Sequence, residues 1–227
     1  TQRRNGKGVK SEDDAILASI KTNTIDNLLL FTNKGKMYKI LVDKLPIGTN
    51  VSKGQNIASL ISIEIDEKVI AAASLDRGVD ADYVVFITKQ GLIKKSLLSE
   101  YTSIKKSTGT QAIKLKDGDG IANVLFMKEE DLILISKQGM TIRFTTSDIS
   151  PIGRVTSGVK GIKLNDNDEV VAGLVVKEGL DLAVINKNGT GKKCKITDFT
   201  AQGRGGKGVK GSGEEIAGAA LVGEEDN

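Results

Sequence analysis

The chain has 227 residues, of which 39% are hydrophobic and 27% charged, a composition that predicts a folded globular protein with a substantial core. It contains no histidine and a single cysteine, Cys194, so the commonest general base is missing and no internal disulfide can form. The lone thiol fits a reducing cytoplasm, and no apolar run approaches the roughly 20 residues of a membrane span, so we expect a cytoplasmic protein without a membrane partner. The net charge is only +4, so the position of the cations matters more than their excess.

A short apolar run followed by a tight turn with glycine recurs along the chain. The four runs lie at residues 28–31, 84–87, 132–135 and 182–185. The glycines of the turns are Gly35, Gly91, Gly139 and Gly189. Runs of Val, Ile and Leu that end in Asn, Gln or Lys next to glycine are typical of β-hairpins. The sequence therefore predicts four hairpins.

A second glycine follows each turn glycine after 18 or 19 residues, and a further β-rich segment comes after it. These second glycines are Gly54, Gly109, Gly158 and Gly208. A constant offset indicates the same intervening structure in every repeat. Four strands per repeat of about fifty residues predict an all-β, propeller-like radial array.

We interpret the chain as one incomplete domain built from such units. Their expected bounds are residues 1–24 (partial), 25–81, 82–130, 131–180 and 181–227. A stack of repeats leaves strand edges open where it is cut. The count therefore predicts either an open arc or flanking segments that the sequence does not include.

A cation stands four residues after each turn glycine. These four residues, the cation column, are Lys39, Lys95, Arg143 and Lys193. In a radial array one position per repeat forms one stripe, and a stripe of cations suits a phosphate backbone. Lysine on a strand edge also blocks unwanted pairing, so the column alone leaves both interpretations open.

The strongest local motif is a basic, glycine-rich segment at residues 2–10. It recurs at residues 202–210 with seven of nine positions identical, and residues 153–160 form a third relative. Glycine lets backbone N–H groups approach an anion, and guanidinium groups bind phosphate in a fork. The motif adds three candidate phosphate-binding residues, namely Arg154, Arg204 and Lys207. The acidic run 165–169 lacks the glycine and distal glutamate of a calcium loop, so no metal site is predicted.

Residues 2–8 resemble the gyrase A box of DNA gyrase A subunits, Gln-Arg-Arg-Gly-Gly-Lys-Gly, at six of seven positions. The repeats, notably residues 148–162, resemble the C-terminal domain of the same family. This resemblance implies a β-pinwheel, whose four-stranded blades exchange strands, and a basic rim that wraps duplex DNA without sequence specificity. It assigns DNA binding, and the capacity of the enzyme to supercoil, to the box residues Gln2, Arg3, Arg4, Asn5, Gly6, Lys7 and Gly8.

The resemblance further implies that this segment has no catalytic residue and no cofactor of its own. ATP and Mg would act elsewhere in the parent ATP-dependent type IIA topoisomerase, DNA gyrase. The implied partners are duplex DNA, the gyrase B protein and the remaining domains of gyrase A, in an A2B2 enzyme at the nucleoid. Two alternatives remain: the C-terminal domain of the corresponding topoisomerase IV protein, and a propeller-like scaffold for other proteins, against which the 4% aromatic content argues.

Overall fold

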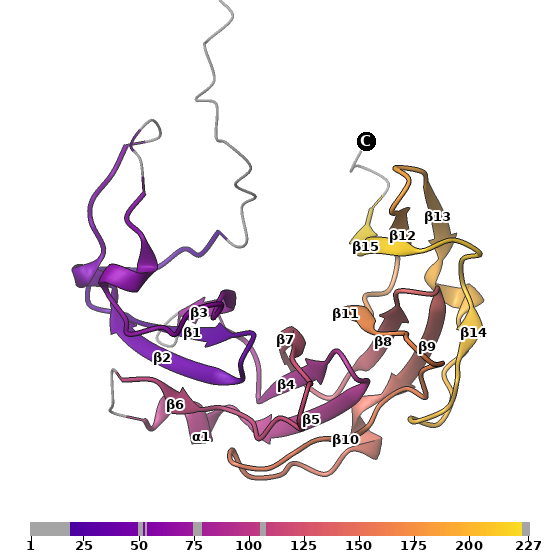
Figure 1. Ribbon diagram of the computed structural model, residues 1–227, viewed down its shortest axis with the longest axis horizontal. Coiled ribbons are helices and arrows are strands. Elements are labelled where there is room, and N and C mark those ends of the chain that lie inside the picture. The colour runs from indigo at the N-terminus through magenta and orange to yellow at the C-terminus, as the bar shows by residue number, and fades with distance from the viewer. Residues whose placement is uncertain (1–18, 50–51, 53, 75–78, 105–107, 224–227) are drawn as a thin grey trace, which may run out of the picture.

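The computed structural model describes residues 19–49, 52, 54–74, 79–104 and 108–223 (Figure 1). Its described part contains fifteen β-strands, a single four-residue helix α1 (Ser99–Thr102) and short 3₁₀ segments. The predicted all-β class is confirmed. The 3₁₀ segments are Val42–Lys44, Ile57–Ser59, Thr146–Asp148 and Ile196–Asp198. In the described residues no helix is long and apolar enough to cross a bilayer.

The strands form four antiparallel sheets. Sheet 1 contains, in spatial order, β3 (Val69–Ser74), β1 (Asn27–Thr32), β2 (Lys36–Leu41) and β6 (Thr110–Gln111). Sheet 2 contains β10 (Val159–Lys160), β5 (Leu92–Leu97), β4 (Tyr83–Thr88) and β7 (Ile121–Met127). Sheet 3 contains β11 (Val170–Val175), β8 (Asp131–Ser136), β9 (Met140–Thr145) and β14 (Val209–Lys210). Sheet 4 contains β13 (Gly191–Lys195), β12 (Asp181–Asn186) and β15 (Ile216–Val222).

The sheets follow one another around an open arc, with sheet 1 and sheet 4 at its two ends (Figure 1). The hairpins β1–β2, β4–β5, β8–β9 and β12–β13 are those predicted from the turn glycines. Strands β10 and β14 lie on the convex side of the arc, and β7 and β11 lie on the concave side (Figure 1). The convex side, which we call the rim, therefore carries the short strands.

Each four-stranded sheet takes its rim strand from the following repeat. We call β6, β10 and β14 the exchanged strands, because they pair with β2, β5 and β9 of the preceding repeat. The residues directly before them are the second glycines Gly109, Gly158 and Gly208. The repeat pattern alone placed all four strands in one unit, whereas the resemblance implied the exchange. A strand of two residues is too short for its sequence to indicate which strand it pairs with.

The core lies between consecutive sheets. Phe31 of β1 packs on Phe86 of β4 with ring centroids 5.6 Å apart, and Tyr101 lies 6.0 Å from Phe31. Leu132 and Leu134 of β8 pack in the same way against residues of sheet 2. The central strands are covered on both faces, which explains their continuous apolar runs in place of the alternation of a half-exposed strand.

Backbone hydrogen bonds set the register between neighbouring sheets. The Val170 N–H donates to Lys89 O at 2.8 Å and the Ile216 N–H donates to Lys137 O at 2.7 Å. A chain of exposed ion pairs runs beside these bonds, with Lys137 3.9 Å from Glu169 and 2.9 Å from Glu215. Each exposed pair contributes at most about 1 kcal/mol. The backbone bonds therefore constrain the register of neighbouring repeats more than the exposed ion pairs do.

Candidate nucleic-acid interface

The box residues lie outside the described part of the chain. These are Gln2, Arg3, Arg4, Asn5, Gly6, Lys7 and Gly8. The other two copies of the motif are described, and they place the motif in the fold. Both copies run into an exchanged strand, one into β10 and the other into β14, at the rim.

The cation column does not form a stripe of free charges, and Lys95 is the clearest case. Its side chain on β5 is 2% exposed. Its Nζ lies 2.7 Å from Glu129 Oε1, donates to Thr146 O at 2.8 Å and lies 4.6 Å from the centre of the Tyr83 ring. The prediction of Lys95 as a rim contact is therefore wrong. Its ammonium joins sheet 2 to the third repeat from inside.

The other members of the column also have partners within the protein. The guanidinium of Arg143 is 2.8 Å from Asp131 Oδ2, and Lys193 Nζ is 3.7 Å from Asp181 Oδ2. Lys39 Nζ donates to Thr102 O at 3.4 Å. Arg143 and Lys193 each pair with an aspartate twelve positions earlier, in the first strand of the same hairpin. That spacing is a signal in the sequence that our interpretation missed.

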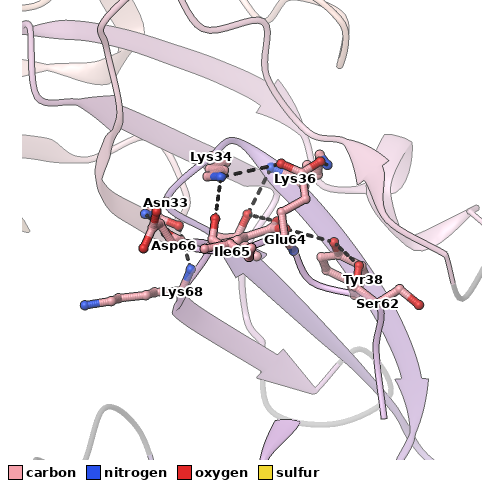
Figure 2. A network of polar contacts seen from close by, with 11 residues as sticks. Asn33, Lys34, Lys36, Tyr38, Ser62, Glu64, Ile65, Asp66 and Lys68 are labelled. Carbon is pink, nitrogen blue, oxygen red and sulfur yellow. Dashed lines mark hydrogen bonds and ion pairs between the residues drawn. The ribbon is translucent and has the colours of Figure 1, made fainter. Parts of the chain in front are cut away.

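The first hairpin shows the same use of lysines (Figure 2). The ammonium groups of Lys34 and Lys36 both contact Glu64, and Lys34 also donates to Ile65 O at 2.7 Å. The hydrogen bond to Glu64 raises the pKa of Lys36. Next to them, burial and Glu67 raise the pKa of Tyr38 to about 12, since its hydroxyl lies 3.2 Å from Glu67 Oε2. Lys34 and Lys36 therefore make their contacts within sheet 1 and the segment that follows its hairpin.

The cations of the glycine-rich motif are more accessible. We call residues 153–158 and 202–208 the rim loops. Arg204 is exposed, and its guanidinium donates to two carbonyl oxygens, those of Asp148 at 3.4 Å and Lys160 at 3.2 Å. Lys207 is exposed and has no ion pair within the described residues. Carbonyl oxygens do not neutralise a guanidinium, so Arg204 keeps its positive charge. Arg204 and Lys207 can therefore both attract an anion.

Consecutive rim segments are joined to one another along the convex side of the arc. The Lys114 N–H donates to Thr156 O at 3.0 Å, and the Lys163 N–H donates to Gly206 O at 2.8 Å. The Gly205 N–H donates to Gly161 O at 2.7 Å. Four further exposed cations, none of them among the predicted contacts, occupy this belt: Lys114, Lys160, Lys163 and Lys210. Lys160 and Lys210 are the second residues of their exchanged strands. The repeated Gly-Val-Lys triplet is the sequence feature from which these two cations could have been predicted.

Arg154 is held more closely than Arg204. Its N–H donates to Glu100 Oε2 at 2.8 Å, its guanidinium donates to Gln111 O, and its carbonyl accepts a hydrogen bond from the Lys94 ammonium. Its side chain is half-exposed. The arrangement provides a preformed cationic group at the rim. In the described residues no group of three or more acidic, histidine or cysteine side chains is placed to hold a metal ion.

The comparison with known families decides the identity of the fold. Four segments match the sequence model of the DNA gyrase C-terminal domain, described as a β-propeller, at residues 26–76, 82–126, 130–177 and 180–222. The chain belongs to the DNA gyrase C-terminal domain family. The predicted resemblance to the C-terminal domain of gyrase A is confirmed, and so is the β-pinwheel class.

Relatives of this gyrase-type domain support the assignment. The chain is 40% identical over 217 residues to the DNA gyrase A protein of Helicobacter pylori and 36% identical over 216 residues to that of Mycolicibacterium smegmatis. Each alignment covers 92% of the chain but 26% of the relative, so the chain spans about a quarter of these proteins.

Two solved structures resemble the domain closely. The C-terminal domain of a DNA topoisomerase IV is 32% identical with a TM-score of 0.85, covering 96% of this chain and 70% of that one. A DNA gyrase A C-terminal domain is 28% identical with a TM-score of 0.73, covering 94% and 72%. The gyrase-type domain thus shares its architecture with the same region of both enzymes.

A buried lysine next to the rim predicts how stability depends on pH. Lys94 is fully buried, and burial lowers its pKa from 10.5 to about 8, although the Glu100 carboxylate acts in the opposite direction. Between these values the unfolded chain binds the proton that the folded chain has released. The free energy of unfolding should therefore increase with pH in this window.

We expect an increase of about 1–2 kcal/mol between about pH 7.5 and pH 9.5, measured by urea unfolding. Above about pH 10 the raised pKa of Tyr38 has the opposite sign, because the folded chain then holds the proton longer. The Lys94→Met variant is the control and should lose the increase. A variant with the same pH dependence as the parent chain would show that another group is responsible.

Proposed function

We propose that this domain binds duplex DNA along its rim, without sequence specificity, and bends it around the arc. The observation that carries the proposal is a belt of exposed or half-exposed cations on the rim loops, on the exchanged strands and on the segments that follow these strands. Its members are Lys114, Arg154, Lys160, Lys163, Arg204, Lys207 and Lys210. They come from consecutive repeats that hydrogen bonds join in series, so the belt follows the curvature of the arc. A curved, continuous line of positive charge suits a bent phosphate backbone.

The chemistry of the belt favours phosphate over base edges as its target. Most of its members are lysines, which act as flexible point charges, and the rim loops are rich in glycine, whose backbone N–H groups can approach an anion closely. Binding should therefore depend strongly on salt and little on DNA sequence. The box residues at positions 2–8 are proposed as a further part of the same surface, because residues 202–208 repeat their pattern.

The cation column is not part of the proposal. Lys95 is buried, and the charges of Arg143 and Lys193 face carboxylates in their own hairpins. Lys39 is half-buried with a carbonyl partner. Separating Lys95 and Arg143 from their partners to bind DNA would offset much of the gain from a phosphate contact. Lys193 is exposed, and its pair with Asp181 at 3.7 Å holds it only weakly.

Within a whole gyrase, the wrap would place a DNA segment for passage and so allow negative supercoiling. The parent enzyme would be an A2B2 assembly at the nucleoid in which ATP and Mg act in other domains. The same domain of topoisomerase IV is the second candidate, because one such structure has the TM-score of 0.85. Supercoiling of relaxed plasmid by the full enzyme would support gyrase, and relaxation and decatenation alone would support topoisomerase IV.

The test of wrapping uses nicked circular plasmid sealed by ligase in the presence of the chain. We expect the linking number of the product to change progressively as protein is added, and the change to vanish at high salt. A mobility-shift titration with unrelated duplexes should give similar affinities. Binding without a change of linking number would contradict wrapping, and no binding at low salt would contradict the function as a whole.

A further inference from the structure

Lys94 has contacts that join three separate parts of the chain. It lies on β5 of sheet 2 and its side chain is fully buried. Its Nζ donates to Ala112 O at 2.9 Å, in the segment that follows β6, and to the carbonyl of Arg154, in the rim loop of the third repeat. The Tyr101 hydroxyl, on α1, is 3.2 Å away. A buried ammonium with this set of partners has a fixed position.

The position of this ammonium is further fixed by aromatic rings. Nζ lies 5.4 Å from the centre of the Phe86 ring and 5.9 Å from that of Tyr101, distances at which a cation is attracted to a ring face. The Tyr101 hydroxyl donates to Ala112 O at 2.9 Å, so the acceptor of Lys94 is itself held in place. The side chain that reaches Arg154 is thus rigid, unlike a lysine at the surface.

Only one of the two rim loops has this support. Three residues after the turn glycine, sheet 2 has Lys94, whereas sheet 3 has Ile142. Ile142 is fully buried but cannot donate a hydrogen bond to the loop 202–208. That loop is held by backbone bonds such as Gly205 N–H to Gly161 O, and by the Arg204 guanidinium itself. Lys94 therefore adds a contact to the loop 153–158 that the general repeat does not require.

We propose that Lys94 is a positioning residue for Arg154. It holds the arginine carbonyl from inside while Glu100 holds the N–H, so that the half-exposed guanidinium is kept at the rim for a DNA phosphate. The proposal rests on the proposed function for the role of Arg154, although the anchoring can be tested without DNA. Lys94 cannot contact DNA itself, because it is fully buried.

Limited trypsin digestion tests the anchoring directly, because the Arg154–Val155 peptide bond contains the carbonyl that Lys94 holds. In the Lys94→Met variant of the whole chain we expect cleavage after Arg154 to be about tenfold faster or more. The reason is that loss of one charge-assisted hydrogen bond increases the population of the open loop by about this factor. Lys95→Met is the matched control, since it removes the neighbouring buried ammonium, whose partners are Glu129 and Thr146. It should leave cleavage at Arg154 unchanged.

DNA binding supplies the second readout. Lys94→Met should reduce the slope of log affinity against log salt by about 0.9, the value for one phosphate contact. Arg154→Ala should do the same, and the double variant should lose no more than either single variant, because both remove one contact. Additive losses, or a slope in Lys94→Met equal to that of the parent chain, would overturn the link to DNA.

Two outcomes distinguish this proposal from the proposed function. If the parent chain does not bind DNA, the proposed function fails while the trypsin result still decides whether Lys94 anchors the loop. If Lys94→Met is folded by circular dichroism and its cleavage at Arg154 is unchanged, the anchoring is wrong whatever the chain binds. If that variant does not fold, Glu100→Ala serves in its place, because it removes the bond from the Arg154 N–H to the half-buried Glu100 carboxylate. An unchanged cleavage rate there would overturn the proposal that Lys94 and Glu100 together hold the Arg154 backbone.

Discussion

Replacing Gly208 by alanine is expected to lower the free energy of unfolding by about 3 kcal/mol or more. Gly208 has a φ of +72°, and a Cβ built on it would lie 2.3 Å from Thr141 O and 2.7 Å from Thr141 C. Both are backbone atoms, so the clash is relieved only if β14 moves away from β9. Thermal unfolding followed by circular dichroism should show a midpoint lower by about 6–12 °C.

Gly203→Ala is the control for this experiment. Gly203 lies in the same rim loop, but a Cβ added there meets no atom within 4 Å, and its φ is not positive. That variant should unfold within about 1 kcal/mol of the parent chain. If the two variants were equally stable, the close approach of exchanged strand and hairpin would not be required by the fold. If both were equally unstable, the loop itself would be the cause.

Removing three rim cations together should produce the largest loss of DNA affinity. In the variant Arg154→Ala, Arg204→Ala, Lys207→Ala we expect the slope of log affinity against log salt to fall by about 2.7, since each phosphate contact contributes about 0.9. At near-physiological salt this corresponds to a loss of about a hundredfold. Fluorescence anisotropy with a labelled duplex over a salt series measures both quantities.

The control removes three cations of the column instead, in the variant Lys39→Ala, Arg143→Ala, Lys193→Ala. The net charge changes by the same amount, so a general electrostatic effect would be equal in both variants. We expect the slope of the control to stay within about one unit of the parent chain, because these charges already have partners in the protein. A larger fall in the control than in the rim variant would place the DNA along the strands and contradict the proposed path.

Burial shows why the candidate site could be predicted only in part. Lys94, Lys95 and Lys207 are similar to one another in a sequence, each next to glycine or other basic residues. Lys94 and Lys95 lie in a strand with both faces covered, and Lys207 is exposed in a rim loop. Whether a strand has one covered face or two depends on the neighbouring sheet, which local sequence does not specify. The glycine-rich motif depends less on such contacts, because its backbone requirement is local, and the binding of DNA by its cations stays a prediction.

The sequence by itself determined the repeat length, the four hairpins and the rim loops. Turn glycines, apolar runs and constant offsets act over a few residues, so they can be interpreted without knowledge of distant contacts. Only the tertiary structure decided which sheet each short strand joins and which cations remain available. Thr110 pairs with Met37, and Lys95 donates to Thr146 O, because the chain curves each repeat onto the one before it. Such contacts depend on the packing of whole sheets, since the free energy of burying a lysine is offset only by partners that the fold brings to it.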